Sequence, residues 1–316
     1  MAYFCGLVGA FIAAYGPNSQ RGYDLQPALN FLFEQRPFRL ECVDRTPGQP
    51  LPPGTQAIVV EGSQAPYLRT RIETLKLSRT DIPALTIAAD PANFIEIAGG
   101  SRDDWSFQFC AQGEGDSEAD ARDFLREISM ARVGSLVTLN SAGPGGRTGG
   151  RGNLLVDAPA DAPITVHASF GAVEVHNMSA PVRVTAVHVR ATILNTTGRV
   201  DAAGFVVDFA GSTGTVILSA EAEINVKLTS TRFQGSLNAW AQRPVRVLLP
   251  RAFQTPFQAV VNRPKDFVCR TDFCSKVRSE KDGALYVFTY AGDGSAPPGR
   301  IHFRSEQATV VIDASD

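Results

Sequence analysis

Acidic side chains in the second half of the chain are the first candidates for chemistry. Cleavage of a glycan by paired carboxylates, or binding of Ca²⁺, requires two or more such groups close together. The acids in the valine-rich stretch occur singly along the sequence, and two of them fall opposite arginines in the repeat described below. We therefore expect no catalytic residue, cofactor site or metal site there. The acids are Glu174, Asp201, Asp208, Glu221 and Glu223.

The four histidines show no spacing typical of metal ligation or of a catalytic triad. They are His167, His176, His188 and His302. No two lie four residues apart in a predicted helix, and none has an acidic neighbour at metal-ligand spacing. His176 and His188 fall on outward positions of predicted strands, so we expect solvent-facing or turn histidines.

Two glycine-rich segments have some features of nucleotide-binding loops. Gly113-Glu-Gly115 lies between a predicted strand and a predicted helix, but Glu118 stands where the third glycine of a dinucleotide fingerprint belongs. Its charge would repel a pyrophosphate. The segment 143–152 lacks the Gly-Lys-Ser/Thr of a phosphate loop, and no helix follows it. We interpret the first segment as a tight turn and the second as a linker.

Five cysteines are present, namely Cys5, Cys42, Cys110, Cys269 and Cys274. Only Cys269 and Cys274 are close in sequence. A hairpin disulfide between them, formed in an oxidising compartment, and two free thiols both fit the sequence. A zinc site is not indicated, because there is no second cysteine pair and no nearby histidine.

A weak repeat runs from about residue 173 to residue 228. Short alternating apolar segments recur there, separated by turn residues, as in repeat proteins that stack one rung on the next. At an offset of eighteen residues, Asn177 falls on Asn195 and Val182 falls on Val200. Equivalent side chains in successive rungs would lie about 4.8 Å apart. Asn177 and Asn195 should then form an inward-facing amide ladder at one corner.

The charged positions keep the same offset. Arg183 falls on Asp201, and Arg190 falls on Asp208, so opposite charges would face each other in neighbouring rungs. We therefore predict an all-β fold, a β-solenoid like a single-stranded β-helix, with valines inward and one short helix before the repeat. An antiparallel sandwich of short strands is the competing interpretation.

Asn177-Met-Ser179 and Asn195-Thr-Thr197 match the glycosylation sequon. We interpret both as coincidental, because asparagines stacked inward at a corner could not carry a glycan.

Composition shifts divide the chain into segments. Residues 1–16 are apolar, and residues 17–70 are rich in Pro and Gly. Residues 71–140 are predicted to form strands and one helix, at about 117–130. A Gly-rich linker follows at 141–152, then the solenoid repeat at 153–262 and C-terminal capping strands at 263–316. The segment 1–16 resembles the apolar region of a signal peptide but has no preceding Lys or Arg. Export through this segment and a buried N-terminal element both remain open.

The predicted helix begins with a capping box, Ser117-Glu-Ala-Asp120, and continues with apolar residues at helical spacing. The final strands, at about 300–312, should cap the end of the solenoid, because an open rung exposes backbone donors and acceptors.

The overall composition and charge indicate which kinds of partner the chain is suited to bind. The chain has 316 residues, 44% of them hydrophobic, with a formal net charge of -2 and a pI near 6.1. This balance does not suggest nucleic-acid binding. No run of eighteen apolar residues is present, so no transmembrane helix is predicted.

Three stretches resemble a bacterial family of unknown function labelled "putative adhesin". The segment 105–125 is similar to the strand, turn and helix that precede that family's repeat. The segment beginning at Gly171 is similar to its rungs, and 245–250 with 301–313 to its C-terminal part. The resemblance spans about 75–313 and implies a β-solenoid of the bacterial envelope without catalytic residues. The chain departs from the pattern at Ala180, where a rung glycine would be expected.

These features support three functional hypotheses. The first is a non-enzymatic envelope or surface protein, periplasmic or extracellular, that acts as a scaffold or adhesin and binds a glycan or an envelope protein. The second is a carbohydrate-active enzyme on a β-helix, which requires converging acids. The third is a cytoplasmic or membrane-associated stress module that binds a protein by strand pairing.

Overall fold

The computed structural model describes Cys42, Asp44, Thr46 and the ranges 67–90, 94–140, 150–169, 171–293 and 300–315. The predicted apolar segment 1–16, most of the predicted region 17–70 and residues 141–149 of the predicted linker lie outside the described residues. The chain divides into two units, Met1–Gln35 and Arg36–Asp316, and every described residue belongs to the second.

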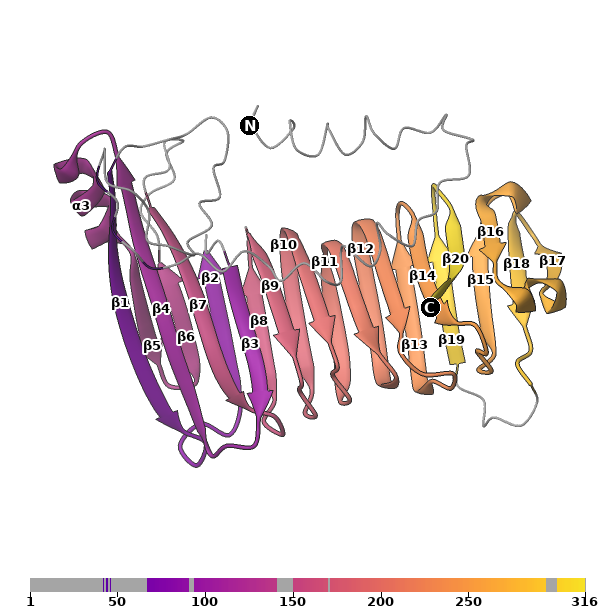
Figure 1. Cartoon of the computed structure of the whole chain (residues 1–316), viewed down its shortest axis with the longest axis horizontal. Coiled ribbons are helices and arrows are strands. Elements are labelled where there is room, and N and C mark those ends of the chain that lie inside the picture. The colour runs from indigo at the N-terminus through magenta and orange to yellow at the C-terminus, as the bar shows by residue number, and fades with distance from the viewer. Residues whose placement is uncertain are drawn as a thin grey trace. The chain divides into compact units, whose positions relative to one another are not determined.

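The described part is mostly β, with twenty strands in one large mixed sheet and one α-helix, α3 (Figure 1). The pairings follow two rows. Row one consists of β5 (Ser129–Val133), β6 (Leu136–Asn140), β2 (Leu85–Asp90), β8 (Ile164–Ala168), the first halves of β10 (Val182–Leu194), β11 (Arg199–Gly211) and β12 (Thr213–Leu228), then β13 (Gln234–Ala241), β19 (Arg300–Ser305), β15 (Phe257–Val261), β18 (Leu285–Tyr290) and β17 (Arg278–Asp282).

Row two consists of β1 (Tyr67–Ser78), β4 (Asp104–Gly115), β7 (Gly150–Pro159), β3 (Phe94–Gly100), β9 (Ala172–His176), the second halves of β10, β11 and β12, then β14 (Val245–Pro250), β20 (Val310–Ser315) and β16 (Phe267–Arg270). Pairing is parallel in the middle of both rows, and antiparallel at one end of row two and at both ends of row one. Strands β10, β11 and β12 contribute to both rows.

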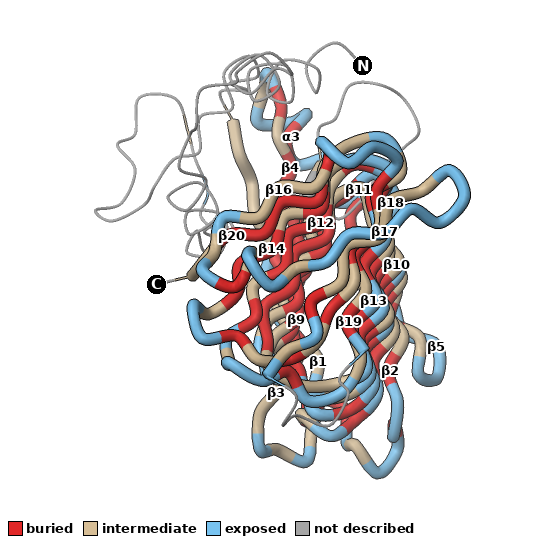
Figure 2. The backbone as a smooth tube through the Cα atoms, turned by 90° about the vertical axis from the view of Figure 1, so that its right-hand side faces the viewer, coloured by how far each residue is buried: buried red, intermediate tan, exposed pale blue. Residues whose placement is uncertain are grey.

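The core lies between the two rows, whose inner faces are formed by buried residues (Figure 2). In each row, register partners form apolar columns. Val182, Val200 and Val216 are successive partners in row one, and all are at most 1% exposed. In row two, Ile193, Phe209 and Val226 are equally buried partners. Alternation along each strand therefore places one apolar side inward, as the sequence pattern indicated.

The predicted offset of eighteen residues holds where β10 pairs with β8 and with β9, and for the first half of its pairing with β11. Val182 pairs with Val200, but Ala191, not Val189, pairs with Val207. The register shifts between Ala186 and Arg190, because β10 carries extra residues there, and His188 among them has a φ of 58°. The next pairing has an offset of sixteen, with Val200 opposite Val216. A bulge of this kind accommodates extra residues in one strand while the apolar columns on either side stay aligned.

The strands do not stack in sequence order at either end. The pair β2 and β3 lies between β6/β7 and β8/β9. The pair β19 and β20 lies between β13/β14 and β15/β16. The prediction that the final strands cap the end is therefore wrong, because they are interior. The edge of row one at that end is β17, whose residues are all exposed and mostly charged. Such a strand discourages pairing with other chains.

The helix α3 (Glu118–Glu127) begins as predicted, with Ser117 as N-cap and a capping box to Asp120. It packs directly on the end of β4, where a Cβ on Gly113 would lie 2.0 Å from the carbonyl oxygen of Ala121. Gly113 and Gly115 thus belong to a strand that needs close helix contact, not to a turn. Residues 150–152 of the predicted linker likewise belong to β7.

Replacing Val200 with Asp should destabilise the fold by about 3–5 kcal/mol, because it buries an unpaired charge between Val182 and Val216. The control is Arg199→Asp at the exposed neighbouring position, which should have a small effect. Urea denaturation followed by circular dichroism measures both. An unchanged midpoint for the Val200→Asp variant would contradict the inward assignment.

Candidate functional site

The outer side of row two carries a line of polar side chains. They are successive register partners in β3, β9, β10, β11, β12 and β14. We refer to Glu96, Glu174, Thr192, Asp208, Asn225 and Arg246 as the polar line. Each lies between two inward-facing residues of its own strand, so the line faces away from the core between the rows.

Three members of the polar line are nevertheless buried. The exposed fraction is 7% for Glu174, 1% for Asp208 and 0% for Asn225. Buried charges are unfavourable unless they are paired and hydrogen-bonded. The contacts of each group therefore decide whether it serves structure or chemistry.

Asp208 is held by three donors. Its Oδ2 accepts from Arg190 Nε at 2.5 Å and from Thr192 Oγ1 at 3.3 Å, and its Oδ1 accepts from Asn225 Nδ2 at 2.8 Å. These contacts satisfy both oxygens of the buried carboxylate, and the pairing with the Arg190 guanidinium offsets the cost of burying its charge. The contacts tie three successive strands together on their outer side.

The predicted stacking of Arg190 directly on Asp208 is wrong in register, although their side chains meet. The register partner of Arg190 is Val206, and that of Asp208 is Thr192. Because of the register shift in β10, the long Arg190 side chain reaches Asp208 diagonally. Asp208 lies on the outer side of its strand, between the inward-facing Val207 and Phe209, yet it is buried.

Further along the polar line, His176 lies between two carboxylates. Its Nε2 is 3.3 Å from Glu96 Oε1, and its Nδ1 is 3.6 Å from Glu174 Oε1. Interaction with Glu96 raises the pKa of His176; burial opposes this shift, and the charge of Glu174 adds to it. Burial raises the pKa of Glu174, an effect that His176 counteracts and Glu96 reinforces. His176 was predicted to be solvent-facing but is only 22% exposed at its side chain.

This group could hold and exchange a proton, but its geometry differs from that of a glycosidase. In such enzymes the sugar lies between the two carboxyl groups. Here the imidazole of His176 occupies the space between Glu96 and Glu174. Among the described residues, no group of three or more His, Cys, Asp or Glu side chains is arranged to hold a metal ion.

The other predicted charge pair is in register but not bonded. Arg183 and Asp201 are register partners in β10 and β11, on the outer side of row one. No ion pair within 4.0 Å joins the two side chains. The remaining repeat acids also lie apart, since Glu221 is exposed and Glu223 pairs with Arg246 at 3.1 Å.

Asn177 and Asn195 follow the paired residues His176 and Leu194, so they lie at the same corner of neighbouring strands. Both have left-handed backbone, with φ of 59° and 51°, a conformation that asparagine tolerates better than most residues. Their backbone N–H groups donate to Leu194 and Ala210. Both residues are exposed, so the predicted inward amide ladder is wrong, and the reason given for dismissing the two sequons is wrong as well.

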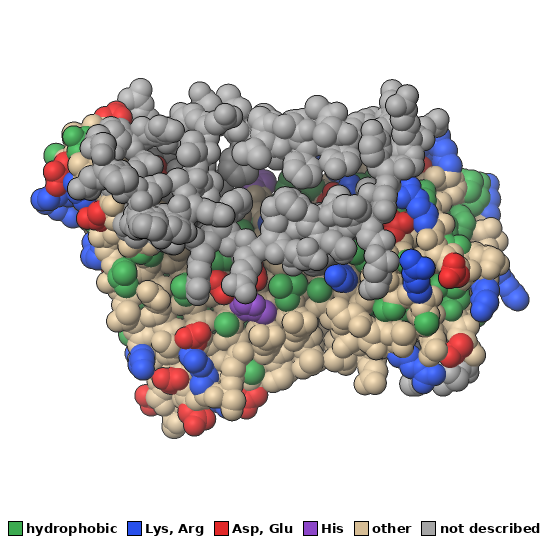
Figure 3. Space-filling view, in the orientation of Figure 1, with side chains coloured by type: hydrophobic (Ala, Val, Ile, Leu, Met, Phe, Trp, Pro, Cys, Tyr) green, Lys and Arg blue, Asp and Glu red, His purple; other side chains and the backbone are tan. Residues whose placement is uncertain are grey.

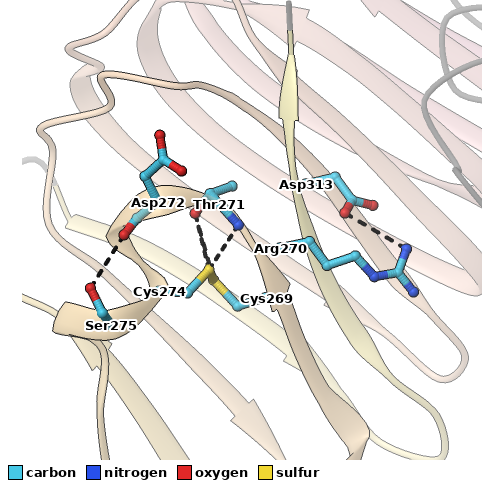
Figure 4. The surroundings of a disulfide bond; sticks show 7 residues. All are labelled: Cys269, Arg270, Thr271, Asp272, Cys274, Ser275 and Asp313. Atoms are coloured by element: carbon cyan, nitrogen blue, oxygen red, sulfur yellow. Dashed lines mark hydrogen bonds and ion pairs between the residues drawn. A yellow bond between two sulfur atoms is a disulfide. The ribbon is translucent and has the colours of Figure 1, made fainter. Parts of the chain in front are cut away.

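Two disulfides join described cysteines. Cys269 of β16 is bonded to Cys274 within the short helix η2 (Asp272–Lys276), and Thr271 donates its backbone N–H to Cys274 Sγ at 3.0 Å (Figure 4). Nearby, Arg270 and Asp313 approach at 3.8 Å. Cys42 is bonded to Cys110 on β4, a pairing that sequence reasoning missed. The alternation of β4 contained a signal, because Trp105, Phe107 and Phe109 point inward and so place Cys110 outward.

No protein-family model matches this chain, and no curated protein matches it. Solved structures do show similarity. A putative cell adhesion protein from Clostridium sporogenes is 8% identical, with a TM-score of 0.34, and the match covers 78% of this chain and 99% of that one. A putative adhesin from Bacteroides fragilis is 11% identical, with a TM-score of 0.30 and coverage of 78% and 97%.

A putative lipid binding protein from Parabacteroides distasonis is 9% identical, with a TM-score of 0.34 and coverage of 77% and 96%. At these scores the similarities do not establish membership of a family. Within the described residues, no helix has the length and apolar character needed to cross a membrane.

Stability should fall as the pH rises through the titration of His176. Its folded-state pKa is above 6.5, so its ion pairs contribute fully below pH 6.5 and are lost as the pH rises through the folded-state value. Glu174 also lowers stability as the pH rises, but over a lower pH range. Its pKa is raised in the folded state, so ionising it above pH 4.5 is less favourable in the folded than in the unfolded chain.

His176→Gln should flatten this dependence and lower stability below pH 6.5 by about 1 kcal/mol. His167→Gln, which changes an exposed histidine in β8, is the matched control and should leave the dependence in place. Urea midpoints measured across this pH range test the assignment. An identical pH profile for wild type and His176→Gln would show that the ion pairs contribute nothing.

Proposed function

We propose that this chain is a non-enzymatic, exported envelope protein whose strands wind as a β-solenoid and present a long surface for binding. The observation that carries the proposal is the parallel register of β10, β11 and β12, each of which supplies one half to each row. A chain that passes from row one to row two and back once per repeat builds such a pattern. Repeat architectures of this kind provide extended binding surfaces.

The polar groups support a structural rather than a catalytic role. Asp208, the most buried acid of the polar line, has three donors, and Glu223 is paired with Arg246. The charges of Asp208 and Glu223 are therefore paired with groups of the protein itself. On the face seen in Figure 3, acidic and basic side chains gather toward both ends of the described part and are interspersed there. No broad region of one sign is visible on that face.

The disulfides support location outside the cytoplasm. Four of the five cysteines are paired, and Cys42–Cys110 closes a separation of 68 residues. Disulfides persist in oxidising compartments such as the periplasm and the cell surface, and are rare in the cytosol. An envelope scaffold or adhesin-like protein accounts for both the fold and these bonds.

The winding can be tested with engineered cysteines. Arg183→Cys combined with Asp201→Cys should form a disulfide under mild oxidation, because these partners occupy adjacent strands about 4.8 Å apart. Arg183→Cys with Ile217→Cys, two strands apart, is the control and should not cross-link. Mass spectrometry of the digested protein identifies the bond. Cross-linking of the control pair instead would overturn the stacking.

Export is tested by trapping thiols in fractionated cells of the source organism. The mature protein should be found in the envelope fraction, with Cys42, Cys110, Cys269 and Cys274 protected from alkylation until a reductant is added. A cytoplasmic protein with these four thiols reduced would overturn the proposal. So would glycan cleavage by the purified protein that is lost in a Glu174→Gln or Asp208→Asn variant.

A further inference from the structure

Among the described residues, the outer face of row one carries fewer buried polar groups than the polar line on row two. Its central positions carry mostly small or uncharged side chains, aligned by register across β12, β13 and β19. Trp240 of β13 lies between Ser219 of β12 and Arg304 of β19. One pleat away, Asn238 lies between Ile217 and His302. These six residues are called the Trp240 patch.

Trp240 is the most unusual member of the patch. Its exposed fraction is 36%, and no other Phe, Tyr or Trp among the described residues is classed as exposed. Exposing an indole forfeits the favourable burial that most aromatic side chains obtain in a core. The other tryptophan, Trp105, is fully buried, and its indole N–H donates to the carbonyl of Ile82 at 2.9 Å. Trp240 therefore lacks the core role that explains Trp105.

We propose that the Trp240 patch binds one chain of an uncharged polysaccharide, with a pyranose ring stacked on the Trp240 indole. The C–H face of a pyranose is apolar and fits an exposed aromatic ring, while its hydroxyls need donors and acceptors at the ring edge. Ser219, Asn238 and His302 supply these on neighbouring strands at about 4.8 Å spacing. This inference rests on the proposed function and names the ligand class that the surface recognises.

The charges of the patch favour a neutral sugar over an anionic one. Arg304 is the only Lys or Arg in the patch, and Glu306 lies 3.7 Å from it. On the same face, Arg183 is aligned with Asp201, and their opposite charges give this pair no net charge. A polyanion would therefore find no concentrated positive potential here.

The apolar area favours a sugar over a protein or a lipid surface. Only Ile217, at 37%, and Trp240 are exposed large hydrophobic residues in the patch. A stable protein interface needs a broad buried core, and an interfacial membrane contact needs a continuous apolar stripe with basic flanks. One indole surrounded by hydrogen-bonding side chains meets neither requirement, but it matches the layout of a sugar subsite.

Binding can be measured by titrating the full chain with cellohexaose, laminarihexaose, chitohexaose and mannohexaose, using tryptophan fluorescence and calorimetry. Because the chain has two tryptophans and Trp105 is buried, a spectral change on binding should come from Trp240. At least one hexasaccharide should bind. Trp240→Ala should weaken that binding about tenfold or more, and Trp240→Phe should retain most of it.

Val133→Ala, at an exposed apolar position on β5, is the matched control and should not alter affinity. Asn238→Ala should weaken binding about threefold to tenfold through a lost hydrogen bond. The wild type should not bind oligogalacturonate or phosphatidylcholine vesicles, and it should not self-associate through the patch.

Absence of binding by every neutral hexasaccharide would overturn the inference. So would binding that is unchanged in Trp240→Ala, or Trp240-dependent binding of only the anionic sugar, the vesicles or a second copy. If the Arg183–Asp201 cross-link and export hold while the sugar titrations fail, only the sugar inference is lost. The proposed function falls separately if the cross-link or export experiment fails.

Discussion

The structure depends on one constraint, that apolar side chains in neighbouring parallel strands must remain in register. Val182, Val200 and Val216 form one such column, and each is almost wholly buried. A slip of one residue in any of these strands would turn the whole apolar side outward. The column therefore fixes the alignment of everything that the strands carry on their outer side.

The outer faces follow from that alignment. Because β9, β10, β11 and β12 are held in register, residues far apart in sequence become neighbours at strand spacing. On row two this brings Asp208 between Thr192 and Asn225, and on row one it brings Trp240 between Ser219 and Arg304. One face uses its polar groups to neutralise buried charge, while the other leaves an indole exposed.

The ends of the rows show how the same constraint is maintained where the repeat stops. Strands β2/β3 and β19/β20 insert within the rows, so the last two described strands are interior rather than at an edge. Three of the four edges among the described strands are antiparallel, namely β5, β17 and β1, and β17 is also mostly charged. At the β1 edge, Asp44 accepts from the backbone N–H of Thr70 at 2.7 Å. These arrangements satisfy or shield edge groups that would otherwise pair with another chain.

Local features could be predicted from the sequence because they depend on neighbouring residues. Alternation located the strands of the repeat, and the capping box at Ser117 located the start of α3. The offset of eighteen residues gave the register of β10 with β8, with β9 and with the first half of β11. Only the tertiary structure decided the rest. The extra residues in β10 changed the register after Ala186, and left-handed backbone turned Asn177 and Asn195 outward. The contacts of His176 with Glu96, and of Cys42 with Cys110, join segments that are distant in sequence. The physical reason is that such contacts depend on which strands become neighbours, and strand insertion and bulges set this through packing of the whole core rather than through any local pattern.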